Sequence, residues 1–362
     1  YVSHRADHNY VLGLMIGELG TSHAYVGGGD MGASAPNIPT GVLGADYETH
    51  ANRIRFKKIY RGLNFEEGRR GPLGEPGVNV EEGDYLLAID GKELGANTNP
   101  HSLLVGKVGR SVTLTVSNRP GMEGARQVRV RPLGSENQLR YIEWVEGNRK
   151  AVAAMSNGRI GYMHVPDTSI PGVIEFIKGY YSQSDKDAMI IDERFNGGGM
   201  IPTFFVERLG RSVDTALRQR RGEDILFPPQ TVRGPMAMMI NGYAGSGGDM
   251  LPWLFKNAKM GPLIGTRTWG GLVGIQGSAA LVDGGFFSAP EFGIYDVKTG
   301  KWIAENTGVD PDIEVDARPD LVAQGKDPQL EKTVEYLLGE LKKGAAGLKS
   351  PTAFPKIPPP AK

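Results

Sequence analysis

The sequence predicts a multidomain α+β chain in which a small β-domain lies between a helical segment and an α/β core. Three observations lead to this fold class. A chain of 362 residues is too long for one ordinary core, so two or three domains are expected. Short alternating strands follow residue 41, and buried strands alternate with helical segments from residue 159 onward. We place the domain boundaries at 1–40 (helical), 41–135 (β), 136–345 (α/β core) and 346–362 (proline-rich tail).

The composition excludes several classes of function. Hydrophobic residues make up 40% and charged residues 23% of the chain, as in ordinary globular proteins. The 41 basic and 41 acidic residues cancel, and no basic stripe is visible, so we expect neither nucleic acid nor an anionic membrane as a partner. No apolar run is long enough to cross a bilayer. The absence of cysteine excludes disulfides, thiol catalysis and cysteine-based zinc sites.

The amino-terminal segment contains one predicted helix. Residues 10–19 form an apolar stretch that suits a buried helix, and a glycine-rich loop follows at 27–32. Residues 1–8 contain neither a start methionine nor the apolar region of a signal peptide. We expect a cytoplasmic protein, and an exported form stays open.

The β-domain is predicted from alternation and β-branched residues. Residues 76–91, with the sequence PGVNVEEGDYLLAIDG, resemble the core signature of a PDZ domain. A PDZ domain binds an extended peptide at a sheet edge, so the resemblance implies peptide binding. An unrelated small β-barrel is the alternative. The strands are predicted at 54–60, 85–89, 111–116 and 127–130, and a helix at 99–108.

The α/β core is predicted from strands separated by helical patterns. Such alternation implies a mostly parallel sheet with crossover helices. Asp327 is placed to cap the final helix, with Pro328 at its first position. The strands are predicted at 159–165, 188–192, 236–240 and 263–265, and the helices at 141–155, 171–180, 202–209, 249–256 and 327–343.

A glycine-bracketed serine follows one of these strands. Ser246 stands between the strand 236–240 and the helix 249–256. This arrangement lifts a hydroxyl to the carboxyl edge of a parallel sheet, where sites form in α/β folds. It also directs the free N–H groups of a helix start at the same place. Taken alone, the pattern fits a serine helix cap equally well.

Two further motifs suit the chemistry of such a serine. The strand 188–192 ends in a turn with three consecutive glycines, whose unshielded N–H groups suit a developing oxyanion, although a plain tight turn would look the same. A serine nucleophile also needs a neighbouring base. The chain has six histidines, and their pattern alone does not choose among them.

The order and spacing of the motifs resemble the carboxy-terminal half of the tricorn peptidases, within the tail-specific peptidase superfamily. The likeness runs from about residue 9 to 345. It implies a core of the ClpP/crotonase type, a homo-oligomer, and cleavage of short or unfolded peptides without a metal or cofactor. The motifs are G-T-S-H at 20–23, the PDZ-like segment, R-F-N-G-G-G at 194–199, G-S-G-G-D at 245–249, and the segments 263–271 and 305–312.

The resemblance also implies roles for individual residues. Ser246 would be the nucleophile and His23 its base, with Glu305 orienting the imidazole and Ser22 completing a hydrogen-bond relay. The backbone N–H groups of two glycines would form the oxyanion hole, namely Gly199 and Gly247.

The sequence departs from the family pattern at two positions. Gly247 stands where the archaeal form has an acid, but only the backbone amide is needed there. The family's acidic specificity residue aligns with Leu217, which predicts a preference for apolar over basic side chains. Asp214, three residues earlier, could restore a negative pocket.

Three other functions compete with this interpretation. A C-terminal processing peptidase would activate its serine with a lysine in the turn after the next strand, and the turn 268–271 contains none. A non-catalytic PDZ scaffold for peptide binding would retain the fold without turnover. A metallohydrolase is not supported, because no H-E-x-x-H or comparable spacing occurs.

Overall fold

The computed structural model describes residues 2–277 and 280–344. The chain folds as two compact units, one of Asp30–Lys150 and the other of Tyr1–Gly29 together with Ala151–Lys362. The boundary between them falls within helix α2 (Asn137–Met155). No helix in the described ranges is long and apolar enough to span a membrane. The tail predicted at 346–362 lies outside the described residues, and the residue limits of the predicted domains stay predictions.

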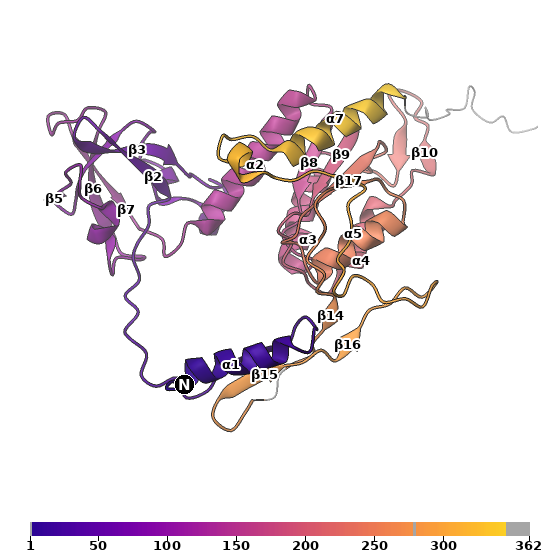
Figure 1. Cartoon of the computed structure of the whole chain (residues 1–362). Helices are drawn as coiled ribbons and strands as arrows, with labels where there is room; N and C mark the ends of the chain where they lie inside the picture. The colour runs from indigo at the N-terminus through magenta and orange to yellow at the C-terminus, as the bar shows by residue number, and fades with distance from the viewer. Residues whose placement is uncertain (1, 278–279, 345–362) are drawn as a thin grey trace, which may run out of the picture. The chain divides into compact units, whose positions relative to one another are not determined.

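The smaller unit is built on an antiparallel sheet with the strand order β2-β3-β4-β6-β7, and β5 pairs with β4 (Figure 1). All four strands predicted for this region are present. The predicted helix at 99–108 is a shorter 3-10 helix, Pro100–Leu104, whose start is capped by the Asn99 side chain. Two more 3-10 turns lie at Glu67–Arg69 and Pro72–Gly74. The strands are β2 (Ala45–His50), β3 (Arg53–Ile59), β4 (Tyr85–Ile89), β5 (Lys92–Glu93), β6 (Val112–Ser117) and β7 (Arg126–Val130).

The larger unit contains a five-stranded sheet whose described pairings are all parallel, as predicted. The strands at 160–164 and 188–192 are buried at every residue, which agrees with their mostly apolar sequences. In spatial order the strands are β17 (Ile313–Glu314), β13 (Leu263–Gly265), β12 (Met236–Ile240), β9 (Ala188–Asp192) and β8 (Ile160–His164).

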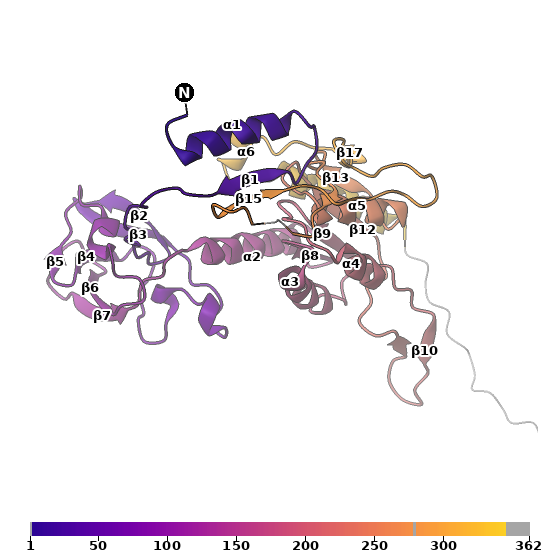
Figure 2. The same cartoon turned by 90° about the horizontal axis from the view of Figure 1, so that it is seen from below.

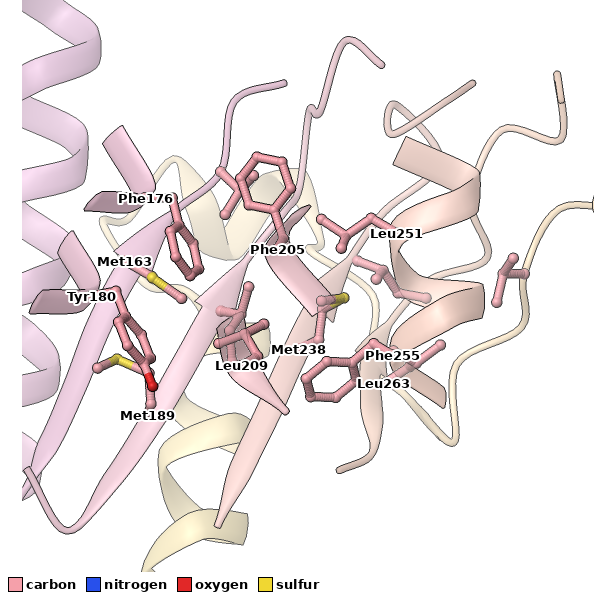
Figure 3. Packing of buried hydrophobic residues seen from close by; sticks show 14 of the residues in the cluster. Met163, Phe176, Tyr180, Met189, Phe205, Leu209, Met238, Leu251, Phe255 and Leu263 are labelled. Carbon is pink, nitrogen blue, oxygen red and sulfur yellow. The ribbon is translucent and has the colours of Figure 1, made fainter. Parts of the chain in front are cut away.

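Helices cover both faces of this sheet (Figure 1). The helices α3 (Ile170–Tyr181), α4 (Pro202–Leu209) and α5 (Gly247–Asn257) contribute aromatic and aliphatic side chains to one core. Figure 3 shows Phe176, Phe205 and Phe255 from these helices packed over methionines of the strands. On the other face, α7 (Pro328–Lys342) contacts β9, β12 and β13. Asp327 caps α7 as predicted, since its carboxylate accepts from the Leu330 N–H at 3.0 Å.

The amino-terminal helix is exposed, which corrects the prediction of a buried one. No residue of α1 (Arg5–Gly17) is buried, and Tyr10 is 68% exposed. The helix packs on the strand β1 (Tyr25–Gly28), which pairs with β15 (Gly285–Ser288) (Figure 2), and Arg5 pairs with Asp283 in the turn before β15. A two-stranded ribbon cannot enclose a helix, so the apolar stretch stays open to solvent. The remaining elements are β10 (Thr215–Leu217) paired with β11 (Ile225–Phe227), β14 (Val273–Gly274) paired with β16 (Phe292–Gly293), and α6 (Pro319–Val322).

Candidate active site

Ser246 lies at the carboxyl edge of the parallel sheet, between β12 and the first turn of α5. Its backbone adopts φ 58° and ψ −115°, a conformation that costs an L-residue on the order of 1–3 kcal/mol. Such strain persists only where the surroundings fix it. Here the Ser246 N–H donates to Asp249 Oδ2 at 2.8 Å, and the Gly245 N–H donates to the Asn196 carbonyl at 3.1 Å.

The triple-glycine turn after β9 packs directly against this loop. A Cβ at Gly198 would lie 2.8 Å from the Ser246 Cβ, so a larger residue would displace the serine. Gly199 has φ +140°, a conformation that only glycine adopts readily. At Gly247 a Cβ would lie 2.0 Å from Thr168 Oγ1, so any side chain there would force its surroundings to move. No described residue accepts a hydrogen bond from the N–H of Gly199 or Gly247.

A hydrogen-bonded relay joins the amino-terminal arm to a loop near the other end of the chain. Ser22 Oγ lies 2.9 Å from His23 Nδ1 and donates to Glu305 Oε2 at 3.0 Å. The Ser22 hydroxyl donates its single proton to the Glu305 carboxylate. Its contact with His23 Nδ1 must therefore be a hydrogen bond in which a protonated Nδ1 donates to the Ser22 oxygen. This order leaves His23 Nε2 unprotonated in the neutral imidazole, as a general base requires.

Glu305 is held in place by three donors. Its Oε1 accepts from the Ser22 N–H at 2.8 Å, and its Oε2 accepts from the Leu272 N–H at 2.7 Å as well as from the Ser22 hydroxyl. The neighbouring Asn306 side chain donates to the Gly20 carbonyl at 2.6 Å. These contacts lock the arm that contains His23 onto the loop at 305. The ring of Trp269 supports the imidazole from the side, with 5.8 Å between the ring centroids.

The serine, the imidazole and the two glycines meet in one cavity of about 200 Å³. Apart from His23, no described residue that lines this cavity is titratable. Its walls are mostly apolar and come from α4, α5, the paired strands β14 and β16, and residues next to these elements. They are formed by Met200, Pro202, Met250, Leu272, Val273, Gly274, Ile275, Phe292 and Ile294.

Comparisons with known families and proteins show what the chain is similar to. Residues 41–135 match the tricorn protease PDZ domain, and residues 159–315 match peptidase family S41. The chain is 38% identical over 343 residues to tricorn protease homolog 1 of Streptomyces coelicolor, which covers 94% of this chain and 31% of that protein. It is 36% identical over 339 residues to the tricorn protease of Thermoplasma acidophilum. This match covers 93% of this chain and 31% of that protein. A crystal structure of the tricorn protease superposes with a TM-score of 0.87 at 35% identity, over 94% of this chain and 33% of that one.

The chain is a tricorn-like member of peptidase family S41. The resemblance and the fold class deduced from the sequence are therefore confirmed. This tricorn-like chain spans about a third of the length of the relatives it matches.

The residues predicted to set the specificity of this tricorn-like chain lie elsewhere. Leu217 is 54% exposed on β10, opposite Ile225 of the paired strand. Asp214 accepts a hydrogen bond from the Ser212 hydroxyl at 2.8 Å. Neither belongs to the described residues that line the cavity at Ser246. Their role in specificity stays a prediction, whereas the apolar walls of that cavity could not be read from the sequence.

The sequence did not indicate a role for two buried carboxyl groups near Ser246, those of Asp249 and Glu193. Asp249 could have been suspected, because an acid three residues after a serine cap is typical of a capping box. Glu193 offered no such signal. It is fully buried, and neither of its carboxyl oxygens has a hydrogen-bond partner among the described residues. Burial raises the pKa of the Glu193 carboxyl well above its usual range, and the carboxyl groups of Asp249 and Asp192 raise it further.

The raised pKa of the Glu193 carboxyl predicts that the stability of the protein depends on pH. The folded chain keeps the Glu193 proton at pH values where the unfolded chain has released it, so this group lowers stability as the pH rises above about 4.5. Glu193→Gln mimics the protonated form and removes this loss. We expect its free energy of unfolding, relative to the unmodified protein, to increase with pH by up to about 1.4 kcal/mol per unit.

Urea unfolding at a series of pH values between 4.5 and 8 measures this difference. Glu18→Gln, at an exposed position, is the matched control and should give a curve parallel to that of the unmodified protein. A parallel curve for Glu193→Gln as well would show that Glu193 is ionised in the folded state.

Proposed function

We propose that this chain is a serine peptidase that cleaves short or unfolded peptides through an acyl-enzyme. Ser246 is the nucleophile, His23 the general base, and Glu305 with Ser22 the relay that orients the imidazole. The observation that carries the proposal is the continuous relay from Glu305 through Ser22 to His23, which ends in the cavity that also contains Ser246.

The reaction follows from the positions of these groups. Ser246 Oγ attacks the peptide carbonyl carbon while its proton passes to His23 Nε2. The N–H groups of Gly199 and Gly247, which have no described acceptor, stabilise the resulting oxyanion. The C–N bond then breaks, and the imidazolium returns its proton to the leaving amine. Water attacks the acyl-enzyme with the same base and releases the second product.

The PDZ domain fits an extended or unfolded substrate. PDZ domains bind peptides by adding them as a strand to a sheet edge, which a stably folded protein does not provide. A C-terminal processing peptidase with a Ser–Lys pair is a weaker proposal, since no lysine is among the described residues lining the cavity. A non-catalytic peptide scaffold remains the alternative of a different class.

A serine-directed phosphonate separates a peptidase from a scaffold. The reagent reacts with an activated serine, and we expect one adduct on the intact protein that maps to Ser246 in the digest. The rate of hydrolysis of a fluorogenic peptide should fall in proportion to the fraction of the protein that the phosphonate has labelled. An intact protein that neither labels nor cleaves any peptide would favour the scaffold.

The apolar cavity predicts cleavage after hydrophobic residues. A leucine side chain there gains roughly 25 cal/mol for each Å² removed from water. A lysine would be desolvated without a carboxylate partner, because no acidic side chain is among the described lining residues. We expect kcat/KM for matched fluorogenic peptides to be at least about tenfold higher with Leu than with Lys before the scissile bond.

Two variants show which residues set this preference. Met250→Asp introduces a carboxylate into the wall of the cavity and should raise kcat/KM for the lysine peptide relative to the leucine peptide. A preference of the unmodified protein for Lys or Arg that is abolished by Asp214→Ala would instead show that Asp214 supplies the negative charge.

A further inference from the structure

Asp249 has an unusually complete set of hydrogen bonds for a buried carboxylate. It is the third residue of α5 and has no exposed surface. Its Oδ2 accepts from the N–H groups of Ser246 at 2.8 Å and Gly271 at 3.1 Å. Its Oδ1 accepts from the Gly270 N–H at 2.8 Å and from the hydroxyl of Thr268. One side chain therefore joins the nucleophile loop to the turn that follows β13.

The turn held by Asp249 also contacts the base and its relay. Trp269 lies in this turn, with its ring beside the imidazole of His23. Leu272 follows directly, and its N–H donates to Glu305. The residues that orient His23 are thus fixed to the same carboxylate that holds the N–H of Ser246.

We propose that Asp249 is a positioning residue that sets the nucleophile and the base in register with each other. This inference rests on the proposed peptidase function of Ser246 and His23. Asp249 does not line the cavity, so it acts through the backbone of Ser246 and through the turn at 268–272. Since a misplacement of about 1 Å can cost 100-fold in rate, loss of this register should reduce turnover far more than substrate binding.

A plain helix cap would give a different result. Asparagine replaces aspartate at helix caps with little loss, because one acceptor oxygen is sufficient there. At Asp249 both oxygens accept from two donors each. In an asparagine, an NH₂ group replaces one of the two carboxylate oxygens and would face the two groups that donate to that oxygen. Asp249→Asn therefore breaks half of these hydrogen bonds in either orientation of the amide.

The test compares Asp249→Asn with Asp327→Asn. Asp327 caps α7 in the same unit and forms an ion pair with Arg194, so Asp327→Asn keeps a capping oxygen but loses the ion pair, and it should lower the Tm without reaching the cavity. With a fluorogenic peptide that has Leu before the scissile bond, we expect Asp249→Asn to lower kcat and the rate of phosphonate labelling by about 100-fold, with KM changed less than threefold. Asp327→Asn should retain both rates.

A second pair of variants covers the case in which Asp249→Asn does not fold. Thr268→Val removes one donor to Asp249 Oδ1, whereas Thr268→Ser retains the hydroxyl. We expect Thr268→Val to lower kcat about tenfold and Thr268→Ser to restore it.

The outcomes separate the two proposals. Wild-type kcat in Asp249→Asn, or equal kcat in the two Thr268 variants, would overturn the positioning role and leave the peptidase intact. An unmodified protein without labelling or hydrolysis would overturn both.

Discussion

Replacing Ser246 with alanine is expected to reduce kcat for peptide hydrolysis by about 10⁴–10⁶-fold, on the scale seen when the nucleophile of a catalytic triad is removed. The change removes only the attacking oxygen. The cavity walls and the N–H groups of Gly199 and Gly247 remain, so KM should change little. Active-site phosphonate should no longer label the protein. Steady-state hydrolysis of the leucine-containing fluorogenic peptide measures the loss.

The matched control for this variant is Ser182→Ala, at an exposed serine in the same unit. It should retain wild-type kcat and labelling. If Ser246→Ala retained more than about a tenth of the activity, another residue would have to be the nucleophile, since removal of a triad serine costs several orders of magnitude in kcat.

The second large effect is expected for His23→Ala. Without a base, the serine hydroxyl stays protonated and attacks poorly, so the loss should approach that of Ser246→Ala. Because the two groups act as one unit, the double variant should be scarcely less active than either single variant. Measurement of kcat for the three variants with the same peptide checks both statements.

His8→Ala is the control for the arm on which His23 lies. His8 is exposed in α1, so its replacement leaves the relay of Ser22 and Glu305 intact and should retain full activity. Strong inhibition by His8→Ala together with an active His23→Ala variant would contradict the assigned base.

The parts of the fold that sequence could predict are those specified by neighbouring residues. The strand β12, the glycine-bracketed Ser246 and the start of α5 are adjacent in the chain, so their pattern predicted both the elements and the placement of the hydroxyl. Asp327 is another such case, because a cap followed by proline is a local signal.

The parts that sequence could not predict depend on contacts between distant segments. Strand β2 is polar, with the sequence ADYETH, and is recognised only by its pairing with β3. The helix α1 is apolar yet exposed, because what it packs against is decided by β15 more than 250 residues away. Without the family resemblance, Glu305 could not be distinguished from other loop carboxylates, since its partner Ser22 is 283 residues distant.

This separation between Ser22 and Glu305 has a consequence for the chain during its synthesis. The arm with Ser22 and His23 is synthesised before the PDZ domain and Ser246, and Glu305 is added last of these groups. A nascent chain that has reached α5 contains Ser22, His23 and Ser246 but has neither the turn at 268–272 that bonds Asp249 nor the Glu305 that bonds Ser22. The order of the residues along the polypeptide therefore delays the assembly of the Glu305–Ser22–His23 relay until translation has passed position 305.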